Sequence, residues 1–213
     1  MLAGVAFAIM ALPAMAVQTS LTPPAVSAAL DAGRNMANQH GGYTIAPYLL
    51  FSVPNAVLIL DDNATVEAVQ LGTPFERLRF EAYREQMMRT PFNADDVATF
   101  DEQHANRIDF IVYAHSRTAD DRAFLGRFGG GTLAQADGTT IATAQISRSV
   151  AVVDTYTKPG GVVVNRFLGQ VTYRFVLTGA TAAPAILTGP LTFVFTDDGG
   201  GEHRLPVTLA DFP

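Results

Sequence analysis

Alternation of apolar and polar residues with a period of two is the dominant pattern in the second half of the chain. In segment 171–177 the odd-numbered residues are large and apolar, whereas Thr172 and Arg174 between them are polar. Segment 191–195 repeats the pattern with one leucine and two phenylalanines. Such alternation predicts strands that bury one face. Because turn signals recur after position 107 at a spacing of roughly 8–12 residues, we predict a mainly β protein, an antiparallel β-sandwich that is immunoglobulin-like or similar.

The remaining strands are predicted by the same reasoning. In 107–115 both alternating sets of residues are fairly apolar, which indicates a strand in the centre of a sheet. Segments 162–168 and 171–177 predict either two strands or one long strand kinked at Gly169. Further strands are predicted at 43–53, 57–60, 65–71, 147–155, 205–209, and at 132–136 and 139–144, the last two joined by an Asp-Gly hairpin turn.

Helix signals replace the alternation between residues 73 and 106. The sequence Thr-Pro-Phe-Glu at 73–76 has the residues of a capping box with proline at the first helical position, and it predicts a helix over 74–89. A shorter helix is predicted at 93–105, and a third, near the N-terminus, at 22–36. We therefore predict a sandwich with a two-helix insert at about 73–106, lying across one face or end, and a short N-terminal helix.

The first sixteen residues predict export. Residues 2–12 are an unbroken apolar run, Pro13 ends it, and Ala-Met-Ala follows at 14–16 as a signal-peptidase site. We predict a cleaved signal peptide at 1–16 and a single β-sandwich domain at 17–213. No basic residue precedes the run, so an uncleaved anchor and a buried helix are the alternatives. The run is shorter than the roughly 20 apolar residues that a spanning helix needs, and we predict no membrane span in the mature chain.

Composition narrows the classes of partner. The net charge is -6, which argues against nucleic acid and anionic lipid, since both require a concentrated basic patch. Hydrophobic residues make up 48% of the chain, so a folded core is predicted rather than disorder. The chain has no cysteine, which excludes disulfides and thiol chemistry, and no tryptophan, which disfavours many modes of sugar binding.

Four residues are candidates for a mixed metal site: Asp101, His104, Asp109 and His115. Asp101 and His104 are three residues apart on a predicted helix and therefore share a face. Asp109 and His115 share a face of the strand that follows. Their spacing matches no established metal motif, and histidines beside solvated carboxylates are the competing interpretation.

Paired aspartates occur at 61–62, 95–96, 120–121 and 197–198, each at a predicted turn or helix start where aspartate is favoured locally. The first and last pairs are alternative Ca²⁺ ligands, although neither has the spacing of a calcium loop. We predict no cofactor, with Ca²⁺ or Zn²⁺ as the alternatives. A serine nucleophile is disfavoured, because Ser116 and His115 are adjacent on a strand and point to opposite faces.

The sequence favours a non-enzymatic exported protein, a binding or structural component of the bacterial cell envelope in the periplasm or at the cell surface. Export, the strand pattern and the lack of a catalytic motif support this hypothesis. Its expected partner is another protein or an envelope polymer, and the helical insert is the first surface to test. The alternative is an exported hydrolase acting on sugars or peptides, assisted by a metal, which requires a cleft that gathers the histidines and carboxylates.

Overall fold

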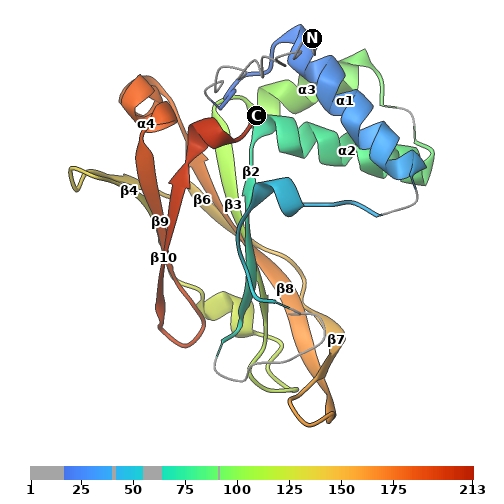
Figure 1. The fold of residues 1–213 in the computed structure, drawn as a ribbon, viewed down its shortest axis with the longest axis vertical. Coiled ribbons are helices and arrows are strands. Elements are labelled where there is room, and N and C mark those ends of the chain that lie inside the picture. Colours follow the sequence, from blue (N-terminus) through green and yellow to red (C-terminus); the bar gives the residue numbers. More distant parts are fainter. Residues whose placement is uncertain (1–16, 40–41, 55–63, 91) are drawn as a thin grey trace, which may run out of the picture.

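The computed structural model describes residues 17–39, 42–54, 64–90 and 92–213. The described part is mainly β and holds two antiparallel sheets, as predicted (Figure 1). Sheet A has the order β1-β2-β3-β8-β6, with β7 also paired to β8, and sheet B has the order β10-β9-β4-β5. The strands of sheet A are β1 (Leu49–Ser52), β2 (Val66–Gly72), β3 (Arg107–His115), β6 (Gln145–Arg148), β7 (Val152–Thr157) and β8 (Val163–Val176). Those of sheet B are β4 (Gly131–Gln135), β5 (Thr140–Ala142), β9 (Pro190–Thr196) and β10 (Glu202–Thr208).

Several strand predictions are confirmed and others are corrected. β3 lies between β2 and β8, as its two apolar faces predict. Of the two alternatives for segments 162–168 and 171–177, one long strand is observed, β8 (Val163–Val176). The strand predicted at 43–53 is wrong over its first half, because Pro47 sits in a 3₁₀ turn before β1. The strand predicted at 147–155 is interrupted between β6 and β7. The predicted signal peptide at 1–16 and strand at 57–60 lie outside the described residues, and the immunoglobulin-like arrangement stays a prediction.

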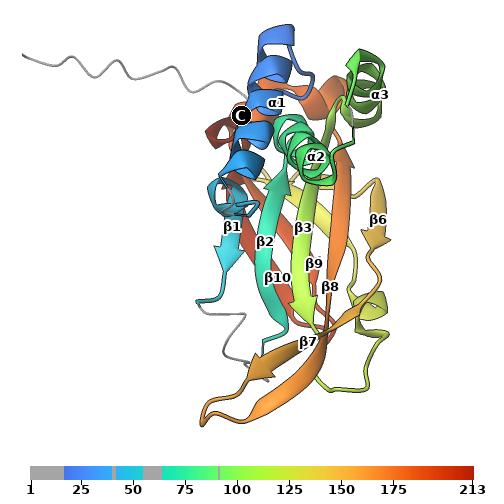
Figure 2. The ribbon, with the colours of Figure 1, turned by 90° about the vertical axis from the view of Figure 1, so that its right-hand side faces the viewer.

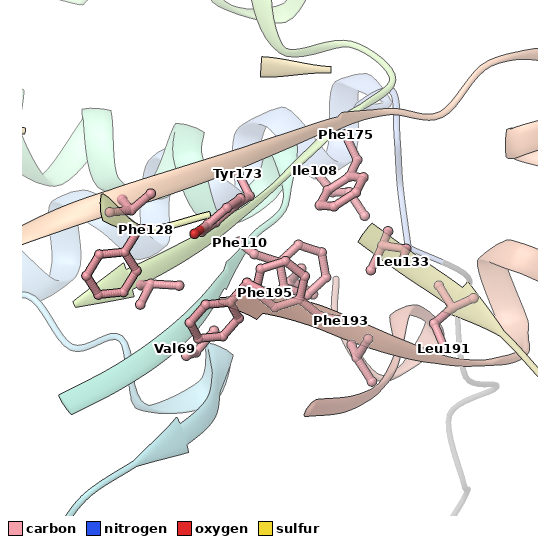
Figure 3. Packing of buried hydrophobic residues seen from close by; sticks show 14 of the residues in the cluster. Val69, Ile108, Phe110, Phe128, Leu133, Tyr173, Phe175, Leu191, Phe193 and Phe195 are labelled. Atoms are coloured by element: carbon pink, nitrogen blue, oxygen red, sulfur yellow. The ribbon is translucent and has the colours of Figure 1, made fainter. Parts of the chain in front are cut away.

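The main hydrophobic core lies between the two sheets. β8 contributes Val171, Tyr173 and Phe175 and β9 contributes Phe193 and Phe195, all of them buried. Figure 3 shows these aromatic side chains packed together, with the Phe110 and Phe193 rings stacked at a centroid distance of 4.2 Å. The alternating pattern at 171–177 and 191–195 therefore predicted the inner faces of two facing strands.

Three helices form a third layer. They are α1 (Pro23–Asn38), α2 (Pro74–Met88) and α3 (Ala94–His104), and a short α4 (Pro184–Thr188) precedes β9. Figures 1 and 2 place the three together over one end of sheet A, on the face that points away from sheet B. Leu78 and Phe100 join α1 residues in a small apolar cluster. Gly33 permits the close approach of α1 to α2, because a Cβ there would lie 2.2 Å from the Arg79 carbonyl oxygen.

The helix starts follow the predicted caps. The Thr22 hydroxyl accepts a hydrogen bond from the Ala25 N–H, and Asn93 forms a complete capping box with Asp96. Thr73 caps α2 by accepting a bond from the Glu76 N–H at 3.2 Å. The Glu76 side chain does not return that bond and instead binds Tyr43. No helix in the described part of the chain is long and apolar enough to cross a membrane.

Candidate functional site

The ribbon formed by β7 and the first part of β8 extends beyond the rest of sheet A. β3 pairs with β8 from Val176 only as far as Leu168, whereas β7 pairs with 163–168. We call residues 152–157 and 163–168 the β7–β8 ribbon. Figures 1 and 2 show it projecting at the end of the molecule opposite the helices. Among the described residues, β7 pairs with β8 alone, so its other edge is open.

Exposed valines concentrate in and around this ribbon. Val153 and Val163 are 62% and 63% exposed. They lie on the same face, because Val153 is two residues from Thr155, Val163 is two residues from Asn165, and Thr155 pairs with Asn165. Five of the large hydrophobic residues that are exposed belong to this region: Val150, Val152, Val153, Val162 and Val163. Val152 directly precedes Val153 on β7, so exposed valines lie on both faces of the ribbon. Exposed apolar side chains gathered on one element are typical of an interaction surface. The ribbon is therefore the best candidate for a contact surface in the described structure.

A buried cluster of three polar side chains joins β7 of the ribbon to β2 and β3 of the same sheet. The Tyr156 hydroxyl donates to Oε1 of Glu67 at 2.6 Å, and Nδ1 of His115 lies 2.9 Å from the same oxygen. The ring of Tyr156 packs against the His115 imidazole at a centroid distance of 5.1 Å. All three residues are less than one tenth exposed. We call Glu67, His115 and Tyr156 the clasp.

Two local irregularities position the clasp. A β-bulge between Val66 and Ala68 shifts the register of β2 against β3 and places Glu67 beside His115. β6 pairs with residues 171–174 of β8 and β7 with residues 163–168, so the pairing is interrupted opposite Gly169. A Cβ at Gly169 would lie 2.5 Å from a Leu125 methyl carbon, so a larger residue there requires the Leu125 side chain to move.

The structure gives most of the predicted metal-site residues other partners. His104 packs its ring on Phe100 at 3.9 Å and pairs Nδ1 with the Phe100 carbonyl at 2.9 Å. Burial lowers the pKa of His104, against that backbone hydrogen bond, which raises it. Asp109 receives two hydrogen bonds from the Arg174 guanidinium, at 2.8 and 2.9 Å. Asp101 on α3 has a buried carboxylate oxygen without a hydrogen bond.

His115 has different partners from Asp101, His104 and Asp109: its side chain contacts Glu67 and Tyr156. Over the described ranges, no group of three or more histidine, aspartate or glutamate side chains is placed to hold a metal ion. The metal site of Asp101, His104, Asp109 and His115 thus stays a prediction that this geometry does not support. Sequence reasoning missed Glu67 and Tyr156, since neither stands in a motif and the bulge is not visible in the strand pattern.

The paired aspartates have turn, cap and ion-pair roles. Asp95 and Asp96 lie in the first turn of α3, and the Asp96 carboxylate accepts a hydrogen bond from the backbone N–H of the N-cap residue Asn93. Asp197 accepts backbone hydrogen bonds from Gly199 and Gly201, at 2.8 and 2.9 Å. Asp121 pairs with Arg127, Asp198 pairs with Arg117 and Arg127, and the pair at 61–62 lies outside the described residues. Because Asp197 and Asp198 have protein partners, the Ca²⁺ alternative gains no geometric support from them.

Two cavities lie on the helical side of the molecule and contain none of the candidate residues. One, of about 160 Å³, lies at the end of α2 and is lined in part by Glu81, Met88 and Phe92. The other, of about 370 Å³, lies beside the end of α1 and Thr44. Neither of these two cavities brings histidines and carboxylates together, so neither supports the hydrolase alternative.

A second buried polar cluster joins α2 to the segment before β1. The Tyr43 hydroxyl donates to Oε1 of Glu76 at 2.7 Å and accepts from Nε of Arg79 at 3.2 Å. The Arg79 guanidinium lies over the rings of Tyr43 and Tyr48, at 5.0 and 4.7 Å from their centroids. Burial raises the pKa of Glu76, against the charges of Arg77 and Arg79 and the bond from Tyr43, which lower it.

The raised pKa of Glu76 sets the sign of a pH dependence. A carboxyl whose folded-state pKa is above its unfolded value contributes stability below the unfolded pKa, and that contribution is lost as the pH rises through the folded pKa. The Glu76→Gln variant cannot ionise. Its stability relative to the natural chain is therefore expected to increase from about pH 4 to about pH 7, as measured by urea unfolding at each pH. An unchanged difference across this range would contradict the raised pKa.

Comparison of the chain with protein-family models, with curated proteins and with solved structures found no match.

Proposed function

We propose that this chain is an exported, non-enzymatic binding protein of the bacterial cell envelope, and that the β7–β8 ribbon is its contact surface. The observation that carries the proposal is the set of exposed valines on a projecting ribbon whose outer strand edge has no pairing partner among the described residues. A partner that covers exposed aliphatic side chains gains roughly 25 cal/mol per Å² of apolar area removed from water. Exposed apolar surface of this kind is therefore typical of a binding site. Export rests on the apolar run and Ala-Met-Ala sequence at 2–16.

The chemistry of the ribbon favours a polypeptide partner over a glycan. An open strand edge offers backbone donors and acceptors that an added strand satisfies, while alternate side chains supply specificity. The exposed large hydrophobics of the ribbon are all valines, which contact aliphatic side chains but give a sugar ring no aromatic platform. The partner that fits is therefore an extended, apolar protein segment.

The helical insert is the weaker surface of the two. α1 packs against α2 and covers part of it, and the exposed large hydrophobics of the insert are Met87 and Met88 at the end of α2. Both residues belong to α2, and Figure 1 shows α2 and β7 at opposite ends of the molecule. Labels at the two places therefore report on separate surfaces.

Site-specific photo-crosslinking in a bacterial host tests the proposal. The full chain carries a photoreactive residue at position 155 in the ribbon, at 88 in the insert, or at the exposed position 140 on β5 as the control. We expect a discrete protein adduct from position 155 only, in the envelope fraction, on a chain that begins at Val17. An adduct from position 88 only assigns the contact to the insert, and a glycan adduct overturns the polypeptide partner.

The double variant Val153→Thr, Val163→Thr supplies the matched loss of function. It removes one methyl from each of two exposed side chains, which at about 0.8 kcal/mol per group weakens binding by roughly tenfold. Its thermal midpoint is expected to stay unchanged, because neither side chain is buried. Equal adduct yield from the natural chain and the double variant contradicts the proposed surface, as does recovery of the protein from the cytoplasm alone.

A further inference from the structure

The clasp gathers three kinds of metal-binding donor from three separate parts of the chain. Glu67 lies on β2, His115 ends β3 and Tyr156 lies on β7. The Tyr156 hydroxyl oxygen and His115 Nδ1 both lie within 2.9 Å of Glu67 Oε1. Metal–ligand bonds of about 2.0–2.2 Å place neighbouring donors roughly 3 Å apart, so these two separations are close to those around a single ion.

The local backbone points to a site rather than to ordinary strand packing. The bulge at 66–68 interrupts regular pairing at the residue that supplies the carboxylate. Bulges of this kind re-aim a side chain and occur preferentially next to functional sites. Glu67, His115 and Tyr156 are 8%, 4% and 2% exposed, so an ion held there would be shielded from bulk water.

We propose that Glu67, His115 and Tyr156 form a binding site for ferric iron. Carboxylate and phenolate oxygens are hard anionic donors that suit a trivalent cation, and imidazole is compatible with iron. The clasp combines one imidazole, one carboxylate and one phenol, and His115 is its one residue among the four that the sequence suggested.

Binding is an exchange of a proton for the ion at Tyr156. The O–H bond of the phenol breaks, its proton leaves to solvent, and the oxygen forms a bond to Fe³⁺ without any change of oxidation state. In the clasp the Nδ1–H of His115 donates to the Glu67 carboxylate. On binding, this proton leaves Nδ1 and the neutral imidazole carries its proton on Nε2, so that Nδ1 contributes its lone pair and Glu67 contributes a carboxylate oxygen. Burial raises the pKa of Tyr156, and its hydrogen bond to Glu67 adds to the rise, so the phenol keeps its proton at neutral pH until a cation replaces it.

The ion would join β2, β3 and β7 through bonds that replace the clasp hydrogen bonds. This would fix the ribbon against sheet A, and a ligand that binds the folded state alone raises the thermal midpoint. The inference does not depend on the function proposed for the valines, because the clasp side chains are buried whereas those valines are exposed.

The test is a titration of the full chain with ferric nitrilotriacetate at neutral pH, with Zn²⁺ and Cu²⁺ in parallel. A visible phenolate-to-iron charge-transfer band that saturates at one equivalent, together with a higher thermal midpoint, is the expected result. Tyr156→Phe keeps the ring but removes the oxygen, and is expected to lose the band. Glu67→Gln is expected to weaken iron binding by about tenfold or more.

Tyr113→Phe is the control, because Tyr113 is a phenol on β3 that donates to Gln70 at 2.7 Å, outside the clasp. It is expected to keep the band. Near-ultraviolet circular dichroism of each variant shows whether it is folded. A chain that shows no band and no stabilisation overturns the proposal, and so does a band that persists in folded Tyr156→Phe. Binding of Zn²⁺ or Cu²⁺ without Fe³⁺ overturns the assignment to ferric iron.

Discussion

Replacement of Phe193 by alanine is expected to lower the free energy of unfolding by about 3–5 kcal/mol, the range for deleting a large aromatic side chain from a packed core. Phe193 has no exposed surface and lies on β9 in the middle of the inter-sheet core. Its ring stacks on Phe110 at 4.2 Å and on Phe195 at 5.1 Å, and it meets Tyr173 edge-on at 5.4 Å. The alanine variant removes one aromatic contact from each of these three rings.

Chemical unfolding of the full chain measures this effect, with Phe193→Leu as the matched variant. Leucine refills part of the cavity but cannot restore the aromatic contacts, so its loss is expected to be well below that of alanine. The edge-to-face and stacked contacts themselves contribute about 0.5–1.5 kcal/mol per pair. If the alanine and leucine variants were equally stable, the Phe193 cavity would have collapsed and the ring would not be the centre of the core.

The sequence predicts those parts of this fold that depend on neighbours in the chain. Thr22, Thr73 and Asn93 start helices because a cap involves residues two or three positions away. The hairpin at Asp137 forms because Gly138 adopts a positive φ of 86°. The inner face of 171–177 follows from alternation alone. In each case the determining interaction is local, so a short window of sequence contains it.

The candidate site depends on distant contacts and was not predicted. Tyr156 and Glu67, which meet at 2.6 Å, are 89 residues apart in the chain. The bulge that brings Glu67 to His115 is a property of how β2 pairs with β3. Glu76 was predicted to close the α2 capping box, yet its side chain binds Tyr43, which is 33 residues away. A single sequence carries no signal for such pairings, because strand register and tertiary packing decide them.

The same limit applies to the aspartates at the β9–β10 turn, where the sequence indicated a turn or a calcium ligand. The Asp198 side chain is completely buried. Its Oδ1 accepts a hydrogen bond from the Thr65 hydroxyl at 2.7 Å and lies 3.2 Å from the Arg117 guanidinium. The Arg127 guanidinium is 3.5 Å from its other oxygen. Asp198 therefore links the turn of sheet B to the start of β2 and to the connection between β3 and β4.

Asp198→Ala is accordingly expected to lower the free energy of unfolding by about 2–4 kcal/mol. Breaking a buried ion pair costs about 3–5 kcal/mol when the remaining charge stays buried. Arg117 and Arg127 are 34% and 47% exposed, so water recovers part of that cost. Asp198→Asn retains an acceptor for Thr65 and is expected to lose less, whereas Glu202→Gln, which breaks an exposed pair with Arg204, is expected to unfold as the natural chain does. Urea unfolding separates these outcomes, and an Asp198→Ala variant as stable as Glu202→Gln would show that the two arginines gain nothing from Asp198.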